Sequence, residues 1–244
     1  MEHGSVPAVE DLCGVWVRRS LEWADGRSDT TTRVTWLQGG QWFVDLRLPA
    51  VDTPQSELAA FAGRLVQSGS ASAEFTWQRI VDWSPDSPPD VGRLRWEGDL
   101  LIEDGVLQPY REVWMRAERH RPDASATALL RNGAGRDVVL LRSAGFFGYA
   151  VGRTPDPNAD GSDCSDCSDC SDCEVSLGAI HDGRWRIDSS TRNETADTPI
   201  YLQFNETHTQ LTVTAAPDRA CLLSGDWRVV GITGDASLLQ THEE

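Results

Sequence analysis

Three short segments in the first half of the chain set charged side chains among aromatic rings. If each segment is a strand, alternate residues point to one face, and that face carries both kinds of side chain. The shared faces hold Phe43, Asp45 and Arg47 in Trp42–Pro49; Phe75, Trp77, Arg79, Val81 and Trp83 in Glu74–Trp83; and Tyr110, Glu112, Trp114 and Arg116 in Tyr110–Arg116. Buried together, such groups would surround a small molecule that has a polar centre. The alternative is an outer face on which arginines stack on tryptophans near water.

The candidate catalytic residues are Glu112, Asp45 and Arg79. Apolar walls raise the pKa of a carboxyl group, which could then act as a general acid or base. Asp45 lies two residues from Arg47 on the same face, and an ion pair between them would lower the pKa of Asp45 and leave it structural. The candidate ligand-binding residues are Trp36, Arg47, Trp77, Trp96, Trp114 and Tyr110.

Four Ser-Asp-Cys tripeptides in Ser162–Cys173 place Cys164, Cys167, Cys170 and Cys173 at C-x-x-C spacing. Thiolates at this spacing could bind copper(I) or zinc, or hold an iron–sulfur cluster. Zinc sites normally separate their cysteine pairs by a longer gap, and the run lacks the proline signature of cluster ferredoxins. We therefore favour a duplicated tripeptide in a solvated loop, residues 160–174, and predict no metal there. The five histidines form no metal-spaced pair.

All 22 basic residues are arginines, because the chain contains no lysine. A Schiff-base aldolase, a pyridoxal-phosphate aldimine and a P-loop each need a lysine amine, so these mechanisms are excluded. The sequence also has no G-x-S-x-G and no G-x-G-x-x-G motif. Whether the protein is an enzyme stays open at this level.

The chain has 244 residues and a formal net charge of −16, from 22 basic and 38 acidic side chains. Such a field repels phosphate backbones and anionic membrane surfaces, so neither nucleic acid nor membrane is an expected partner. No segment has the roughly 18 to 20 consecutive apolar residues of a membrane span, and the N-terminus lacks the features of a secretory leader. We therefore expect a cytoplasmic protein whose partner is a small molecule.

Short strands must position these residues, because apolar and polar side chains alternate with period two in runs separated by turn residues. In the first half the predicted strands are Gly14–Trp23, Thr31–Gln38, Trp42–Pro49, Glu74–Trp83, Val91–Glu97, Asp99–Glu103 and Tyr110–Arg116. One segment, Thr53–Gln67, is predicted to be a short helix, since Leu58, Phe61 and Leu65 would share one helical face. Thr53 could cap this helix.

A polar segment, RAERHRPD at residues 116–123, separates two strand-rich halves. In the second half we predict strands at Ala126–Arg131, Asp137–Arg142, Phe146–Arg153, Glu174–His181, Arg184–Ser189, Ile200–Asn205, Gln210–Ala215 and Ala220–Ile232. Tight turns join strands that are neighbours in sequence, and closing a sheet removes its exposed edges. The prediction is a mostly β protein with two consecutive antiparallel barrels and one short helix. The first barrel spans residues 10–118 and the second residues 124–235.

The first half contains the segments VWVRRSLEW, TTTRVTWLQGGQWFVDLRLP, FTWQRIVDW and YREVWMR. With them the chain resembles a lipocalin-like (calycin) family of tandem small barrels, over most of residues 10–232 in strand order. A fungal branch of that family is known for interacting with a casein kinase. The resemblance implies two lipocalin-like barrels of a kind typical of small-molecule binding, with a few relatives recruited as cyclases or isomerases. It carries over no catalytic residue.

Three functions fit these observations. The first is cytosolic binding of a small apolar or aromatic molecule in the tryptophan-rich first barrel. The second is an enzyme, namely a cyclase, isomerase or lyase that acts in the same cavity. The third is a structural or partner-binding role in which both barrels have filled cores. A cavity with Arg79 and Glu112 directed inward would favour the first two, and indoles packed against one another would favour the third.

Overall fold

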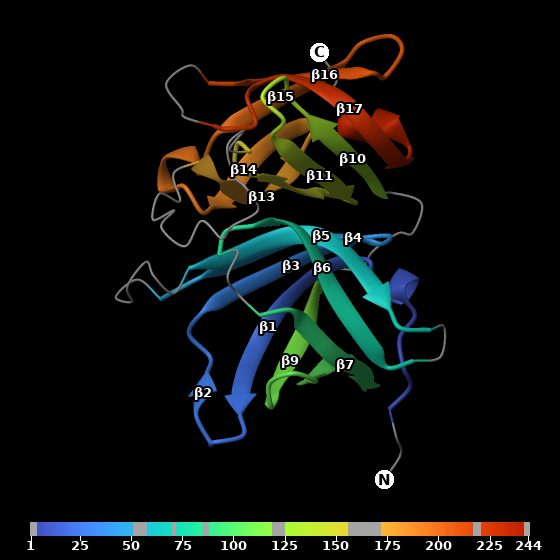
Figure 1. Ribbon diagram of the computed structural model, residues 1–244, viewed down its shortest axis with the longest axis vertical. Helices are drawn as coiled ribbons and strands as arrows, with labels where there is room; N and C mark the ends of the chain where they lie inside the picture. The colour runs from blue at the N-terminus through green and yellow to red at the C-terminus, as the bar shows by residue number, and fades with distance from the viewer. Residues whose placement is uncertain are drawn as a thin grey trace.

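The computed structural model describes residues 4–50, 58–69, 72–84, 88–118, 125–155, 172–216 and 221–241, and these fold into two antiparallel β-barrels (Figure 1). In the first barrel, sequence neighbours pair in the order β1-β3-β4-β5-β6-β7-β8-β9, and β9 pairs with β1 to close the sheet. Its strands are β1 (Gly14–Trp23), β3 (Arg33–Gly39), β4 (Trp42–Leu48), β5 (Ala59–Gln67), β6 (Glu74–Asp82), β7 (Asp90–Glu97), β8 (Leu100–Gly105) and β9 (Tyr110–Glu118), with the two-residue strand β2 (Ser28–Asp29) added beside β1.

The second barrel closes in the same up-and-down manner, with β17 paired to β10. Its strands are β10 (Ser125–Arg131), β11 (Asp137–Ser143), β12 (Phe146–Val151), β13 (Glu174–His181), β14 (Arg184–Ser190), β15 (Pro199–Phe204), β16 (Gln210–Ala215) and β17 (Gly225–Gly234). The predicted pair of consecutive antiparallel barrels is thus confirmed.

The predicted helix is wrong, because its described part forms strand β5. Phe61 and Leu65 both lie in the interior of the first barrel; their spacing of four residues suits one face of a strand as well as one face of a helix. Ala60 and Ala62 point to the opposite face and are also fully buried. Apolar residues on both faces hid the period of two. Residues 53–57 of the expected helix lie outside the described part of the chain.

Within the described residues, the helical elements are short 3-10 turns. They are η1 (Val9–Leu12), η4 (Asn193–Thr195) and η5 (Ala236–Leu239). In this described part, no helix has the length and apolar character needed to cross a membrane.

A bulge in β6 corrects the predicted face of that strand. Ala62 of β5 pairs with Val81, whereas the next residue, Gly63, pairs with Arg79, so Ile80 is an extra residue. Phe75, Trp77 and Arg79 keep the inward face, but Val81 and Trp83 turn outward and join the core between the barrels. A side chain at Gly63 would bring its Cβ to 1.9 Å from the carbonyl oxygen of Gln78. Glycine is therefore required where the bulge draws the two strands together.

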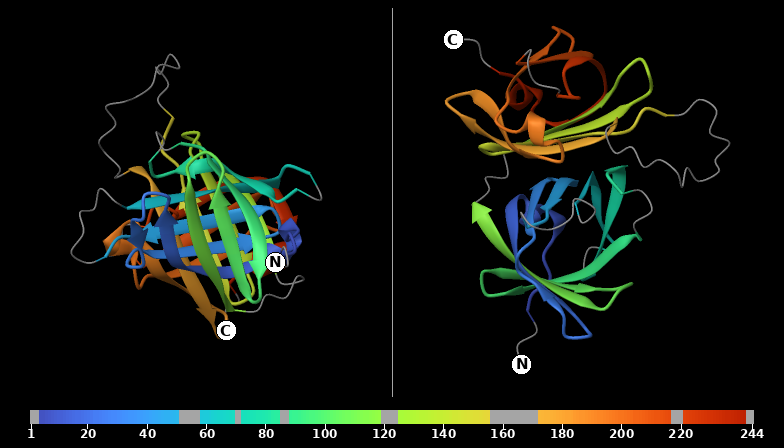
Figure 2. Two further views of the ribbon diagram at one scale, coloured as in Figure 1. Left: turned by 90° about the horizontal axis from the view of Figure 1, so that it is seen from below. Right: turned by 90° about the vertical axis from the view of Figure 1, so that its left-hand side faces the viewer.

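The outer faces of β3 to β6 pack against β11 to β13 of the second barrel (Figure 2). Val44 and Leu46 of β4 are buried there together with Val139 and Leu141 of β11. Gly148 of β12 makes this approach possible, because a Cβ at this position would lie 2.7 Å from Leu177 and 3.2 Å from Val44. The two barrels therefore share an apolar interface, which explains why β4 and β5 are apolar on their outer faces.

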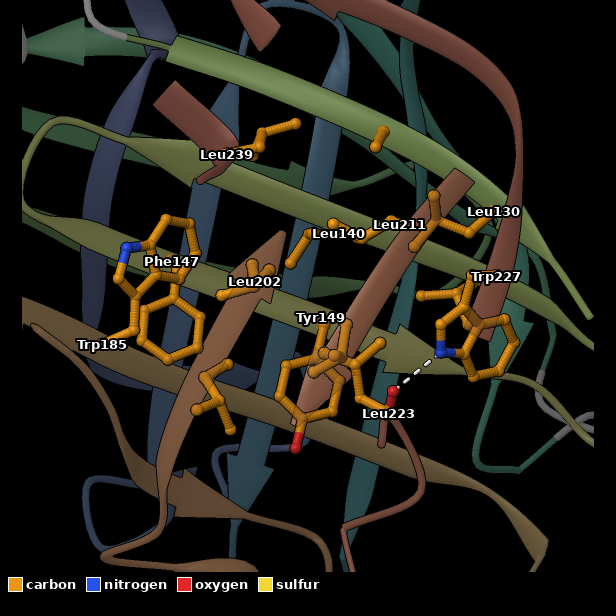
Figure 3. Packing of buried hydrophobic residues seen from close by; sticks show 14 of the residues in the cluster. Leu130, Leu140, Phe147, Tyr149, Trp185, Leu202, Leu211, Leu223, Trp227 and Leu239 are labelled. Carbon is orange, nitrogen blue, oxygen red and sulfur yellow. Dashed lines mark hydrogen bonds between the residues drawn. The ribbon is translucent and has the colours of Figure 1, made fainter. Parts of the chain in front are cut away.

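Large side chains fill the interior of the second barrel (Figure 3). The rings of Phe147 and Trp185 lie 4.7 Å apart, and Trp227 donates its indole N–H to the Leu223 carbonyl at 2.7 Å. The pattern Leu-x-Gly-x-Trp around Trp227 also begins the first barrel, where Trp16 donates to the Leu12 carbonyl at 2.7 Å. The two barrels thus use the same local device, once in the first strand and once in the last.

Candidate binding cavity in the first barrel

Four tryptophans fill one half of the first barrel. The rings of Trp16 and Trp36 stack with centroids 5.9 Å apart. The ring of Trp36 also meets those of Trp77 and Trp114 edge-on, at 5.8 and 5.6 Å. All four side chains are at most 5% exposed, and the partly buried Trp96 packs on Trp16 at 5.7 Å. The structure therefore places the predicted indole walls, Trp36, Trp77, Trp96 and Trp114, in a packed core, and none of them lines the cavity at the other end of the barrel.

The turn η1 and Arg116 close the tryptophan end. Leu12 of η1 is fully buried in the same cluster. The Arg116 guanidinium lies 4.2 Å from the centroid of the Trp16 ring and donates to the main-chain carbonyls of Cys13 and Asp11, the latter at 2.6 Å. A cation over an indole face with its N–H groups satisfied is a stabilising arrangement. One end of the barrel is thus held shut by packing and hydrogen bonds.

A cavity of about 210 Å³ occupies the opposite end of the barrel. Strands β1, β4, β5, β6, β7 and β9 supply most of its lining. The apolar lining residues are Leu21, Trp23, Ala59, Phe61, Pro88, Pro89, Val91 and Leu107. The polar lining residues are Arg47, Arg79, Asp82, Asp90, Gln108, Tyr110 and Glu112. A small set of polar groups within apolar walls is the usual composition of a small-molecule site.

Two arginines and two aspartates of the lining form one ion-pair network. Arg79 donates to Asp82 at 2.8 Å, and its second guanidinium nitrogen lies 3.8 Å from Asp90. Arg47 reaches the same oxygen of Asp90 at 3.4 Å. Both guanidiniums also lie over the ring of Phe61, Arg47 at 4.9 Å and Arg79 at 4.2 Å from the ring centroid. Asp90 is therefore held between two cations at distances longer than the ~2.8 Å of a direct charged hydrogen bond.

Asp45 and Glu112 are both buried and both paired with arginine. The Nε of Arg47 donates to Asp45 at 2.8 Å, and Arg18 donates to Oε1 of Glu112 at 2.7 Å. Arg18 also binds Asp29 at 2.6 Å. Burial raises the pKa of Asp45 and of Glu112, and the arginines oppose this effect. The expectation that the ion pair lowers the pKa of Asp45 is therefore wrong, because loss of solvation outweighs the pairing.

A hydrogen-bonded chain runs from Glu103 through Tyr110 to the cavity. The Tyr110 hydroxyl lies 2.7 Å from Oε1 of Glu103 and 3.1 Å from Oδ1 of Asp90, while Trp114 donates to Oε2 of Glu103 at 3.1 Å. Burial raises the pKa of Glu103 well above its ordinary value of 4.5. A hydroxyl has one proton to donate. If Glu103 carries a proton, it donates that proton to Tyr110 and Tyr110 donates to Asp90, so that each group has a partner.

The structure brings together Arg47, Arg79, Tyr110 and Glu112 at the cavity, and Asp45 lies behind Arg47. Sequence reasoning missed Arg18, Asp90 and Glu103. The available signal for Glu103 was a carboxylate directly after the apolar run Leu100–Ile102. Nothing in the sequence signalled Arg18 or Asp90 in the same way.

Metal-binding candidates lie outside this cavity. Cys164, Cys167 and Cys170 lie outside the described residues, and Cys173 is buried in the core between the barrels. In the described part of the chain, no three His, Cys, Asp or Glu side chains gather to hold a metal ion.

The comparisons with known proteins bear on the fold. No family model and no curated protein matches the chain. Among solved structures, the chain is similar to an uncharacterized protein, YLR301w, from Saccharomyces cerevisiae, with a TM-score of 0.61 at 12% sequence identity. The similarity covers 90% of this chain and 98% of the yeast chain. At this identity it shows that the tandem-barrel fold is shared.

Proposed function

We propose that the first barrel binds a small molecule with an apolar or aromatic part in the cavity at its open end. The observation that carries this proposal is the asymmetry of the barrel interior. One half is packed with tryptophans, whereas the other half is a cavity whose charged groups are fixed by ion pairs. A filled structural core has no need of charged lining residues such as Arg47, Arg79 and Glu112, since a buried charge must be paired.

The lipocalin-like assignment is part of this proposal. An eight-stranded barrel is wide enough either to be filled by side chains or to hold one small ligand, as in lipocalins. Here side chains fill the interior of the second barrel, whereas the first barrel has a cavity in its open half. The cytoplasmic location expected from the sequence stays a prediction, and the casein kinase interaction of the fungal branch is not carried over to this chain.

The test is native mass spectrometry of the full chain after incubation with a small-molecule extract of its own host. Ala59 lines the cavity, so Ala59→Trp fills it, and Ala24→Trp places the same indole on an exposed turn as a control. We expect the wild type and Ala24→Trp to retain a small molecule that Ala59→Trp, shown to be folded by circular dichroism, does not. A bare wild-type mass, or equal retention by Ala59→Trp, contradicts the proposal. Ala59→Leu serves if the larger substitution prevents folding.

A second candidate is an enzyme that acts in the same cavity. The observation that favours it is the Tyr110 hydroxyl, which lines the cavity and is hydrogen-bonded to Glu103, a carboxyl group whose pKa is raised by burial. Such a pair could supply a proton to a bound substrate. Glu112 and Asp45, the carboxylates expected from sequence, are less suited because each is held by an arginine. Incubation of the extract with a trace of protein separates the candidates, since an enzyme converts many equivalents of one compound and Tyr110→Phe abolishes that conversion.

A further inference from the structure

The balance of charge around the cavity distinguishes classes of ligand. Its lining contains two guanidiniums, on Arg47 and Arg79, and three carboxylates, on Asp82, Asp90 and Glu112. The groups directly behind the lining do not reverse this balance. They are one arginine, Arg18, and two further carboxylates, Asp29 and Asp45. The surplus of carboxylates adds to the field of a chain whose net charge is −16, and a low-dielectric cleft focuses such a field.

Acceptors are available on the carboxylates. Glu112 is 3% exposed and lines the cavity, yet Arg18 engages only its Oε1, and no described residue donates to its Oε2. Asp90 is bonded closely by Tyr110 alone, because its two arginine neighbours lie at 3.4 and 3.8 Å. Neither carboxylate has an oxygen that is buried without a partner, so these oxygens are open to the cavity and can accept from a donor on a ligand.

An anion would meet a less suitable surface. Arg47 keeps N–H groups to donate, but it is surrounded by Asp45, Asp90 and Glu112, which hold its own charge in place. A ligand carboxylate at Arg47 would approach Asp90 and Glu112 as like charges. A cation in the same place would approach the same two carboxylates as opposite charges. The aromatic lining adds to this preference, since rings attract cations over their faces.

We propose that the ligand of the first barrel carries a positively charged nitrogen, such as a primary ammonium, on a small apolar or aromatic body, and that Glu112 and Asp90 receive this nitrogen. The inference rests on the proposed function and narrows its ligand class. The nitrogen donates to the oxygens of Glu112 and Asp90 that are open to the cavity, and the apolar body lies against the apolar part of the lining, which includes Trp23 and Phe61.

Calorimetric titration of the full chain with three matched probes tests this ligand class. The probes are 2-phenylethylamine, 2-phenylethanol and phenylacetate, which share a ring and differ in charge. We expect the amine to bind at least about tenfold more tightly than the alcohol, and phenylacetate to bind more weakly than either, because a hydrogen bond to a charged group has this magnitude. Glu112→Gln should remove the preference for the amine. Glu22→Gln removes the same charge from the exposed side of β1 and should preserve the preference.

Each outcome decides the question. Equal affinities for the three probes, tighter binding of phenylacetate, or unchanged amine preference in Glu112→Gln overturns the cationic ligand class and leaves the proposed function standing. If no probe binds, the ligand class is overturned as well. The proposed function then depends on the separate extract experiment, where a retained neutral or anionic molecule supports it and a bare mass contradicts it.

Discussion

Replacing Glu103 by glutamine tests whether this buried carboxyl group is protonated in the folded protein. Its raised pKa means that the folded state holds the proton more tightly than the unfolded state. The stability that Glu103 contributes is therefore fully present below about pH 4.5 and is lost as the pH rises to the folded pKa. Glutamine has no proton to lose. Its amide N–H₂ can donate to Tyr110 and its carbonyl can accept from Trp114, as the protonated acid does.

The expected pH dependence of the unfolding free energy follows from the release of one proton by Glu103. Between pH 5.5 and the folded pKa, the free energy of unfolding of the wild type should fall relative to that of Glu103→Gln by about 1.4 kcal/mol per pH unit. Asp45 and Glu174 also have raised pKa values, but they are common to both proteins and cancel in the difference. Glu112 does not cancel, because its charge acts on Glu103 and helps to raise the pKa of that group.

Urea unfolding followed by tryptophan emission measures this difference, because eight of the ten tryptophans belong to the first half of the chain. The series starts at pH 5.5, since the isoelectric point is about 4.6 and a protein near zero net charge tends to precipitate. Glu22→Gln is the control for loss of a charge at an exposed position. If the two unfolding free energies run parallel from pH 5.5 to 8, Glu103 is already ionised in the folded state and the reasoning is refuted.

Three further substitutions test the packing. Gly148→Val should destabilise the protein by about 1–3 kcal/mol, because its side chain would enter the apolar interface between the barrels; calorimetry should show this loss, and Gly133→Val, in open space, should not. Gly63→Ala should be destabilising by a similar amount or more through its clash with the β6 backbone, and an unchanged melting temperature would contradict the bulge. Trp36→Ala should lower the free energy of unfolding by about 3–5 kcal/mol, because Trp36 is fully buried. Trp23→Ala, at the cavity, should lower ligand retention with a much smaller loss of stability. Equal losses of stability in the two variants would refute the division between core and cavity.

The prediction from sequence was most successful where the two faces of a strand differ in the type of side chain that they carry. In β4, Phe43, Asp45 and Arg47 point into the barrel and Val44 and Leu46 point away from it, as the alternation indicates. It failed in β5 and in the second half of β6. In β5 both faces carry apolar residues, because the second barrel covers the outer face, and in β6 a bulge changes the phase of the alternation.

For the candidate site too, the sequence predicted some lining residues correctly and others wrongly. Arg47, Arg79, Tyr110 and Glu112 could be chosen from alternation and residue type, and all four line the cavity. The tryptophans were predicted to be its walls, yet their rings pack on one another. Alternation shows which face a side chain occupies, but it does not show how far along the barrel axis neighbouring side chains fill the interior.

By itself, the sequence determined the mostly β architecture, the division into two barrels and the inward direction of the charged residues, because these depend on local alternation and on short turns. Only the tertiary structure decided that the barrels share an apolar interface, that one end of the first barrel is sealed, and that Arg18, Asp90 and Glu103 join the network. These features depend on strand register and on contacts between strands distant in sequence. Arg18 and Glu112, for example, are 94 residues apart and meet at 2.7 Å.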